Sequence, residues 1–430
     1  MAEKRHRNRQ RAVRRNYPSV RSALGLSVIV TILAIFASYY IPGELTSLEV
    51  LTPEEKTSDF SFSDFYTMVA ADRDELTVDG NVTIIALDGC SRRQMGRVVT
   101  LADSAGATAI GIDMIFEPPT TETDPMLEAV DTARNVVLPV YLSKAEDGYY
   151  TAFRTSYFDD RLTKQHHYGA VNINGSHIGT TTRYFKIEYD SSEGPIPTMS
   201  AMLAELHRPG SADHIWERGN EMEMINFVGR SFNIITPDEA ETQHHLLKDH
   251  IVLMGMMSDH ADYHRNPLVK TLPGVMIHAY TIATIVNGQY IDEAPGWLNM
   301  LIAALVCVCL VFAGTYCRLT DWGCLLVRVL QTGVLLGALY LGSFAYISRS
   351  YNFDFSPTIL VTVLGLVIMD IVIGGAAVLD NTRRAIRYQR VKHRRRHTHA
   401  VAAVAIVAAP TDSPAVTDTN ITDESETQQS

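Results

Sequence analysis

Four long apolar segments constrain the fold of this chain more than any other feature. They comprise residues 23–41, 297–317, 324–347 and 357–379, and they contain almost no charged side chains. Each is close to the roughly 20 residues that an α-helix needs to cross the hydrocarbon core of a bilayer. A helix in a soluble core seldom stays apolar on every face over that length. The sequence therefore predicts four transmembrane helices.

Basic residues flank this set of segments at both ends. Residues 1–22 hold eight Lys or Arg and one acidic residue, and residues 383–396 hold eight more Lys or Arg. By the positive-inside rule both termini are expected in the cytoplasm, which an even number of spans allows. Residues 42–296 then form a large domain outside the membrane. Residues 380–430 form a cytoplasmic tail that is first basic and then disordered.

The first apolar segment permits a second interpretation, because a basic start followed by an apolar run is also typical of a secretory signal peptide. The run is long for a signal peptide and lacks a clean small-x-small cleavage site. An uncleaved anchor is therefore favoured, and cleavage would leave the large domain on the same side of the membrane.

The net charge of the chain conceals a division between its parts. The whole chain has a formal charge of −11, whereas residues 41–295 contain 38 acidic and 18 basic residues. A surface of that sign disfavours nucleic acid and suits cations or basic and neutral ligands. The same segment contains a single cysteine, Cys90. No internal disulfide is then possible, and the domain must depend on an apolar core.

Strand-like and helix-like segments alternate in the first half of this domain. Residues 82–88, 108–116 and 136–142 are short apolar runs typical of buried strands. Residues 90–106 and 124–135, between them, have amphipathic patterns typical of helices. The β-α-β-α-β order implies parallel strands joined by right-handed crossovers.

The second half of the domain is less regular. Residues 168–174 and 181–189 alternate apolar and polar side chains, which is typical of antiparallel strands covering an edge of a sheet. The α/β pattern then returns, with a helix, two strands and a final helix predicted at residues 196–208, 223–229, 250–257 and 273–288. We therefore predict a mixed, largely parallel α/β sheet with flanking helices, joined to four transmembrane helices.

Eight short motifs in this domain resemble, in order, those of the type-two CHASE domain, an extracytoplasmic sensory module of bacterial receptors. They include VTIIALDGCS, AGATAIGIDMIFEPP, IVLMGMMSDHADYHRNPL and PGVMIHAYTIATIVNGQYI, and together they cover residues 80–291. One span before the domain and three after it is also the layout of that family. The resemblance implies a multi-pass sensor of an external ligand or stress in the bacterial inner membrane, and a possible homodimer. The segment at residues 92–106 departs from the family because it lacks an aromatic-proline stretch.

The output of such a sensor is expected to lie on another protein. Family members usually end in a kinase or a cyclase, but the residues after the fourth span contain no glycine-rich phosphate loop and no catalytic aspartate set. The sequence thus predicts no enzymatic activity, no cofactor and a cytoplasmic kinase or cyclase acting in trans. Two alternatives remain: a scaffold that binds another envelope protein and, ranked lower, a metal-assisted hydrolase.

Two aspartates mark the ends of predicted strands. Asp88 ends the first strand and Asp113 lies near the end of the second. In a parallel sheet both would lie at the carboxyl edge, where ligands bind in open α/β folds. Either carboxylate could bind a ligand or cap a helix or loop. The structural role is slightly favoured for Asp88, and the two roles are equally favoured for Asp113.

The loop after residues 250–257 contains further polar candidates. Asp259, His260 and His264 offer weak metal ligands, since a His-x3-His pair binds zinc when it lies on a helix. No third residue lies at a spacing typical of a zinc ligand, so a polar loop is favoured and no metal is predicted. By resemblance to the family, Asp262 and His278 join Asp88 and Asp113 as ligand-binding candidates. His278 could instead satisfy a hydrogen bond in the core.

The membrane segments contain one buried acid, Asp370, which is costly there without a partner. Arg328 and Gln331 on the neighbouring span are its predicted partners. Contact with a second subunit and exposure to a wet gap are the alternatives. The basic segment at 383–396 is expected to bind anionic lipid head groups. A docking site for a cytoplasmic protein is the more specific alternative and is less favoured by the sequence.

Overall fold

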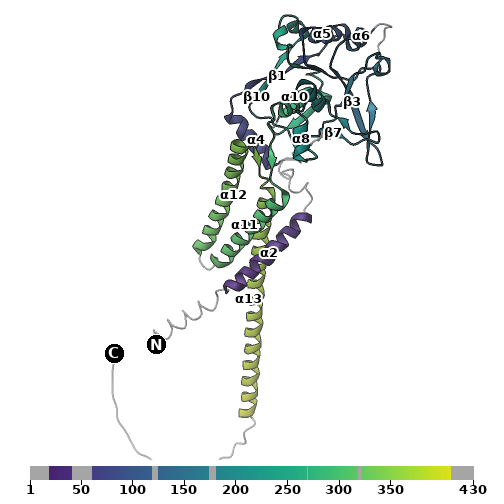
Figure 1. Cartoon of the computed structure of the whole chain (residues 1–430). Coiled ribbons are helices and arrows are strands. Elements are labelled where there is room, and N and C mark those ends of the chain that lie inside the picture. The colour runs from purple at the N-terminus through teal and green to yellow at the C-terminus, as the bar shows by residue number, and fades with distance from the viewer. Residues whose placement is uncertain are drawn as a thin grey trace, which may run out of the picture. The chain divides into compact units, whose positions relative to one another are not determined.

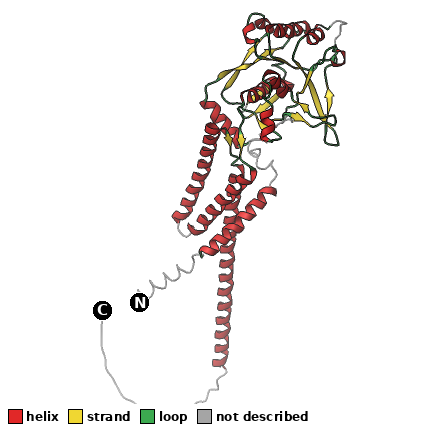
Figure 2. Cartoon of the chain, viewed as in Figure 1, coloured by secondary structure: helices red, strands yellow, loops and turns green. Residues whose placement is uncertain are grey.

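A computed structural model describes residues 19–40, 61–118, 124–173, 181–268, 270–317 and 321–407. The chain divides into two compact units, Met1–Ile368 and Met369–Ser430. Strands gather in one region of the first unit, and long helices occupy another (Figure 2). The predicted N-terminal segment 1–18 and the end of the tail, residues 408–430, lie outside the described residues.

Among the described residues, four helices are long and apolar enough to cross a membrane, as predicted. They are α2 (Val20–Tyr40), α11 (Gly296–Cys317), α12 (Asp321–Arg349) and α13 (Ser356–Val407). Helix α2 lies against α11 (Figure 1). A Cβ atom added at Gly365 of α13 would lie 2.4 Å from the Sγ atom of Cys307 on α11, so this glycine permits a close helix approach.

Helix α13 extends well beyond the predicted span at 357–379. It continues through the basic segment as far as Val407. Residues 376–407 contain neither glycine nor proline and are rich in Ala and Arg, which have high helix propensity. Helix α13 therefore includes the whole basic segment and the first residues of the predicted tail beyond it.

A seven-stranded sheet forms the centre of the α/β domain. Its path is β10-β1-β11-β2-β3-β4, and β5 also pairs with β3. All pairings are parallel except that of β3 with β4, which confirms the largely parallel sheet. The strands are β10 (Arg230–Ile235), β1 (Thr77–Ala86), β11 (Ile251–Gly255), β2 (Ala109–Asp113), β3 (Val136–Lys144), β4 (Tyr150–Arg154) and β5 (His167–Ala170).

Alternate residues of the central strands face two different helical layers. Ile84 and Leu253 belong to a cluster with α7 (Met199–His207) and α10 (Gly274–Asn287). Their sequence neighbours Ile85 and Met254 belong to a second cluster with α5 (Arg92–Ala105) and α6 (Pro125–Thr132). The period-2 geometry of a strand produces this division. The domain therefore has three layers, with the sheet buried on both faces.

Local capping signals set the helix boundaries. Ser91 and Gln94 form a capping box at the start of α5, and Gly106 ends that helix with φ of 88°. Gly288 ends α10 with φ of 62°, at the stop predicted from the sequence. These features confirm helices within the predicted segments 90–106 and 273–288.

Two strand predictions were wrong. Residues 168–174 were expected in an antiparallel pair, but β5 runs parallel to β3. The intervening strand β4 folds back antiparallel on β3, so the chain returns in the original direction before β5 begins. Residues 223–229 were expected to form one strand, but only Glu223–Met224 do so. Phe227, beyond that short strand, packs in the core with its ring centroid 5.1 Å from that of Tyr280. The long strand of this region, β10, begins after Gly229, whose φ is 71°.

Several short elements complete the domain. Two antiparallel pairs include parts of the segment 181–189, as expected. They are β6 (Tyr184–Phe185) with β9 (Glu223–Met224) and β7 (Glu188–Tyr189) with β8 (Ile196–Pro197). The remaining elements are α4 (Phe62–Arg73), α8 (Asp213–Arg218), α9 (Pro237–Ala240), β12 (Tyr263–Asn266), β13 (Lys270–Pro273), β14 (Asp292–Glu293) and β15 (Tyr351–Asn352), and three short 3-10 turns at Asp159–Arg161, His244–Leu246 and His260–Asp262.

Candidate functional site

Asp88 lies just beyond β1 and holds the loop that follows β11. Its carboxylate accepts hydrogen bonds from the backbone N–H of Met257 at 3.0 Å and of Ser258 at 2.8 Å. The Ser258 hydroxyl donates a third at 2.5 Å. Burial raises the pKa of Asp88, but these hydrogen bonds outweigh it and hold the pKa below the ordinary value. The arrangement matches the structural role that the sequence favoured.

Asp113 lies at the end of β2, and its side chain is 12% exposed. Burial and the nearby negative charge of Asp262 raise the pKa of Asp113 to about 7. Its Oδ1 atom lies 3.9 Å from Nε2 of His278, which is longer than a hydrogen bond. The carboxyl group therefore shares a buried space with an imidazole without a direct bond to it.

His278 lies on α10 and is 5% exposed. Its Nδ1 atom lies 3.0 Å from the Oγ atom of Ser200 on α7, so the two form a hydrogen bond across the helical layer. Burial lowers the pKa of His278 to about 4, against the carboxylate of Asp262, which raises it. His278 is thus neutral at physiological pH and satisfies a core hydrogen bond.

Asp262 binds the amino end of α10. Its Oδ2 atom accepts a hydrogen bond from the Gly274 N–H at 3.1 Å, and its Oδ1 atom lies 3.1 Å from Nε2 of His264. A Cβ atom at Gly274 would lie 2.4 Å from the Asp262 carboxylate, so only glycine permits this approach. A carboxylate at a helix N-terminus is also stabilised by the helix dipole.

The weak metal candidates do not come together. Asp259 accepts a hydrogen bond from the Ala261 N–H at 3.0 Å and so caps a short turn. His260 lies in that turn and His264 in β12, so the His-x3-His pair does not lie on one helix. Within the residues that the structure describes, no group of three or more His, Cys, Asp or Glu is placed to hold a metal ion.

The four ligand candidates therefore form two arrangements at the carboxyl edge of the sheet. Asp113, Asp262 and His278 gather around the start of α10, whereas Asp88 is occupied by the loop after β11. A cavity of about 20 Å³ lies beside Ser200 and His278. This is about the space of a single water molecule, and neither Asp113 nor Asp262 is among the residues that line it.

A family model agrees with this architecture. The model of the CHASE2 domain matches residues 29–315, which extend from α2 to α11. The chain belongs to the CHASE2 family. Comparison with curated proteins and with solved structures gave no match in either case. CHASE2 domains are sensory, and the match covers the α/β domain together with most of the helix on each side of it.

The CHASE2 domain contacts helix α12 through helix α4. The sequence did not predict this contact. Tyr66 and Thr67 of α4 lie against α12, and the Thr67 hydroxyl is 2.9 Å from the hydroxyl of Tyr346. A Cβ atom at Gly342 of α12 would lie 2.4 Å from the Tyr66 hydroxyl. Figure 1 shows α4 beside the end of α12. Aromatic residues at 60–66 were the only sequence signal for this contact.

A buried ion pair holds α4 to the rest of the CHASE2 domain. Arg183 Nε and Nη2 donate to the two carboxylate oxygens of Asp64 at 2.7 and 2.6 Å. The side chains are only 9% and 6% exposed. Short strands β14 and β15 add a second connection, because Asp292 pairs with Tyr351 and Glu293 with Asn352, just after α12.

The predicted contact inside the membrane stays a prediction. Arg328 Nη1 donates to the Gln331 side chain at 3.0 Å, one turn along the same helix. Asp370 belongs to the second unit of the chain.

Asp113 and His278 are expected to give opposite pH dependences to the stability of the domain. A carboxyl group with its pKa raised to about 7 keeps a proton that the unfolded chain loses near pH 4, so its contribution falls as pH rises between these values. An imidazole with its pKa lowered from 6.5 to about 4 contributes stability that rises over that interval. In the wild-type chain the two effects largely cancel.

Single substitutions should expose each slope. With Asp113→Asn we expect stability to rise from about pH 4 to 6.5, and with His278→Gln to fall from about pH 4 to 7, each by about 3–4 kcal/mol. The measurement is the denaturation midpoint of the purified full chain across this range, with Glu146→Gln, at an exposed acidic residue, as a control. Identical pH profiles for both variants and the wild type would show that the pair does not titrate.

Proposed function

We propose that this chain is a sensor in the bacterial inner membrane whose CHASE2 domain lies outside and whose termini lie in the cytoplasm. It passes a conformational change to a separate kinase or cyclase. The observation that carries the proposal is the contact between α4 and α12. There the domain that would detect a stimulus packs directly on a helix long and apolar enough to span the membrane.

The geometry of this contact suits a two-state element. Tyr66 and Tyr346 are 0% and 5% exposed and form one apolar cluster with Met224 and Ile291 of the CHASE2 domain. Packed interfaces of this kind switch between discrete arrangements rather than deform continuously. A shift of the CHASE2 domain relative to α12 is therefore the proposed signal, and the basic segment that follows the fourth span is its proposed site of output.

The alternatives have weaker support. A metal-assisted hydrolase at Asp88, Asp113 and Asp262 would need a set of metal ligands, but no group of three or more His, Cys, Asp or Glu in the described residues is placed to hold a metal ion. An envelope scaffold would not need a domain packed so closely on a membrane helix. A second copy of the chain is a proposed partner, since receptors of this type act as dimers.

The test is co-expression with the kinases and nucleotide cyclases of the host that lack a sensor of their own. We expect one of them to change its activity in membrane vesicles severalfold when the chain is present. Vesicles with the chain truncated after α11, and with no chain, serve as controls. If the activity of every such enzyme is the same with and without the full chain, signalling in trans is refuted and the scaffold becomes the better hypothesis.

A further inference from the structure

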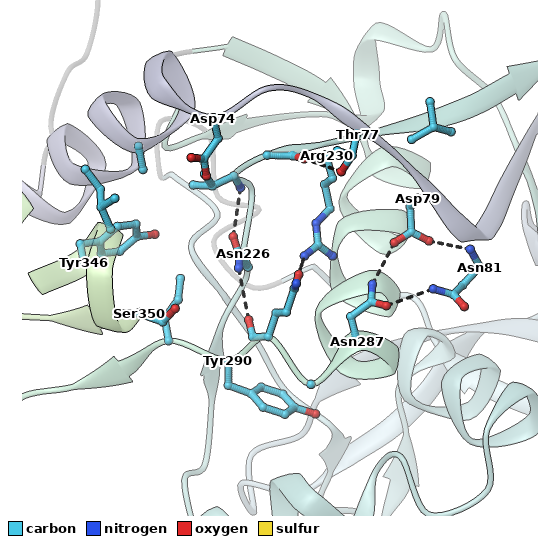
Figure 3. A pocket seen from close by; sticks show the side chains of 18 of the residues that line it. Asp74, Thr77, Asp79, Asn81, Asn226, Arg230, Asn287, Tyr290, Tyr346 and Ser350 are labelled. Atoms are coloured by element: carbon cyan, nitrogen blue, oxygen red, sulfur yellow. Dashed lines mark hydrogen bonds between the residues drawn. The ribbon is translucent and has the colours of Figure 1, made fainter. Parts of the chain in front are cut away.

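A polar cavity of about 590 Å³ lies at the other end of α10, between the CHASE2 domain and α12. It is lined by the start of β1, the start of β10, the residues after α10 and the end of α12 (Figure 3). Cavities of this size accommodate small organic ligands. None of the candidate residues at the carboxyl edge of the sheet belongs to it.

Arg230 lines this cavity and has an unused hydrogen-bond donor. The residue is 6% exposed, and its Nη2 atom donates to the side chain of Gln289. Its Nη1 atom is buried and has no hydrogen-bond partner among the described residues. A buried guanidinium N–H without an acceptor is costly. The preferred acceptor is a carboxylate or another anionic oxygen.

Two carboxylates provide the opposite charge in the same cavity. Asp79 is 8% exposed and accepts hydrogen bonds from the Asn81 N–H and the Asn287 side chain, both at 2.9 Å. Asp74 also lines the cavity and is exposed. Figure 3 shows Arg230 between Asn226 on one side and Asp79 on the other. The cavity thus offers one cationic anchor and two anionic ones, separated by amide side chains.

We propose that this cavity binds a small zwitterion of the α-amino acid class. Arg230 binds the carboxylate of the ligand, and Asp74 and Asp79 bind its ammonium group. A plain anion would be repelled by the two aspartates and a plain cation by the arginine, so a molecule with both charges fits best. The side-chain amides of Asn81 and Asn226 provide further polar contacts.

The position of the cavity gives binding a mechanical consequence, which rests on the proposed sensory function. Tyr346, Ile347 and Ser350 line it at the end of α12. A bound ligand therefore contacts the CHASE2 domain and a predicted membrane helix at once. Helix α10, about 21 Å long, also connects the cavity to Asp262 at its amino end.

The test is direct binding to the purified full chain in lipid nanodiscs. Isothermal calorimetry with each of the common L-amino acids at millimolar concentration is expected to detect at least one ligand. Acetate and methylammonium, which carry one charge each, are expected to bind at least about tenfold more weakly. The variant Arg230→Gln should weaken binding of the amino acid by about tenfold or more.

Two further variants keep the test decisive. Asp74→Asn removes an exposed carboxylate, so it should fold normally and still weaken amino acid binding severalfold. Arg97→Gln alters an exposed pair with Glu241 outside the cavity and should leave binding unchanged. If no amino acid binds the wild-type chain, or if the Arg230 and Asp74 variants bind as the wild type does, the proposal is wrong. The co-expression assay requires no ligand for this cavity, so its result stands independently.

Discussion

Replacing Asp64 by alanine is expected to lower the free energy of unfolding by about 3–5 kcal/mol, the largest effect we predict for a single side chain. The substitution leaves the guanidinium of Arg183 buried without its bidentate partner. It also removes the capping box at the start of α4, where Asp64 accepts a hydrogen bond from the Ser61 N–H at 3.1 Å. Helix α4 should therefore loosen from the CHASE2 domain.

Chemical denaturation of the full chain in nanodiscs provides the measurement, and hydrogen exchange over residues 62–73 shows whether α4 has loosened. Glu241→Ala is the matched control, because it breaks the Arg97–Glu241 pair, whose side chains are 66% and 49% exposed. An exposed pair contributes about 0–1 kcal/mol. Equal losses in the two variants would contradict the assigned role of the Asp64–Arg183 pair.

Gly342→Leu should separate α12 from α4 and remove the output of the sensor. A Cβ atom at this position would lie 2.4 Å from the Tyr66 hydroxyl, and Tyr66 is fully buried, so its ring cannot move aside. Overpacking of this kind costs about 1–3 kcal/mol. The expected functional result is loss of the enzyme response in the co-expression assay, because the contact proposed to transmit the movement no longer forms.

Gly337 gives a control on the same helix. A Cβ atom there meets no atom within 4 Å. Gly337→Leu should therefore keep both the stability and the response of the wild type, and it tests for a general effect of leucine in α12. If Gly342→Leu responds as Gly337→Leu does, the α4–α12 contact is not the route of the signal.

The sequence predicted those elements that have a local physical cause. The four apolar helices follow from the length of an apolar run. The strands at 82–88 and 108–116 and the helices after them follow from periodicity and from caps such as Ser91 and Gly106. The direction of β5 could not be predicted, because alternation shows which face of a strand is buried and not which neighbour it pairs with.

The candidate site was predicted in part for the same reason. Asp113 and Asp262 lie at one edge of the sheet because Asp113 ends β2 and Asp262 follows the neighbouring parallel strand β11, a rule that the sequence could use. Asp262 and His278 themselves became candidates through the resemblance to the family. The pairing of Asp88 with the loop after β11, and of His278 with Ser200, depends on contacts between residues more than 70 positions apart in the chain. No local pattern records such a contact.

The sequence by itself determined the four helices long and apolar enough to cross a membrane, the α/β class and the family of the domain, since each rests on composition, periodicity or ordered motifs. Only the tertiary structure decided which charges are buried and which are paired. Asp64 with Arg183, Tyr66 against Gly342, and Arg230 in its cavity all join segments that are distant in sequence. Burial and partnership arise only when the chain packs, and they decide whether a charged side chain stabilises the fold or remains available to a ligand.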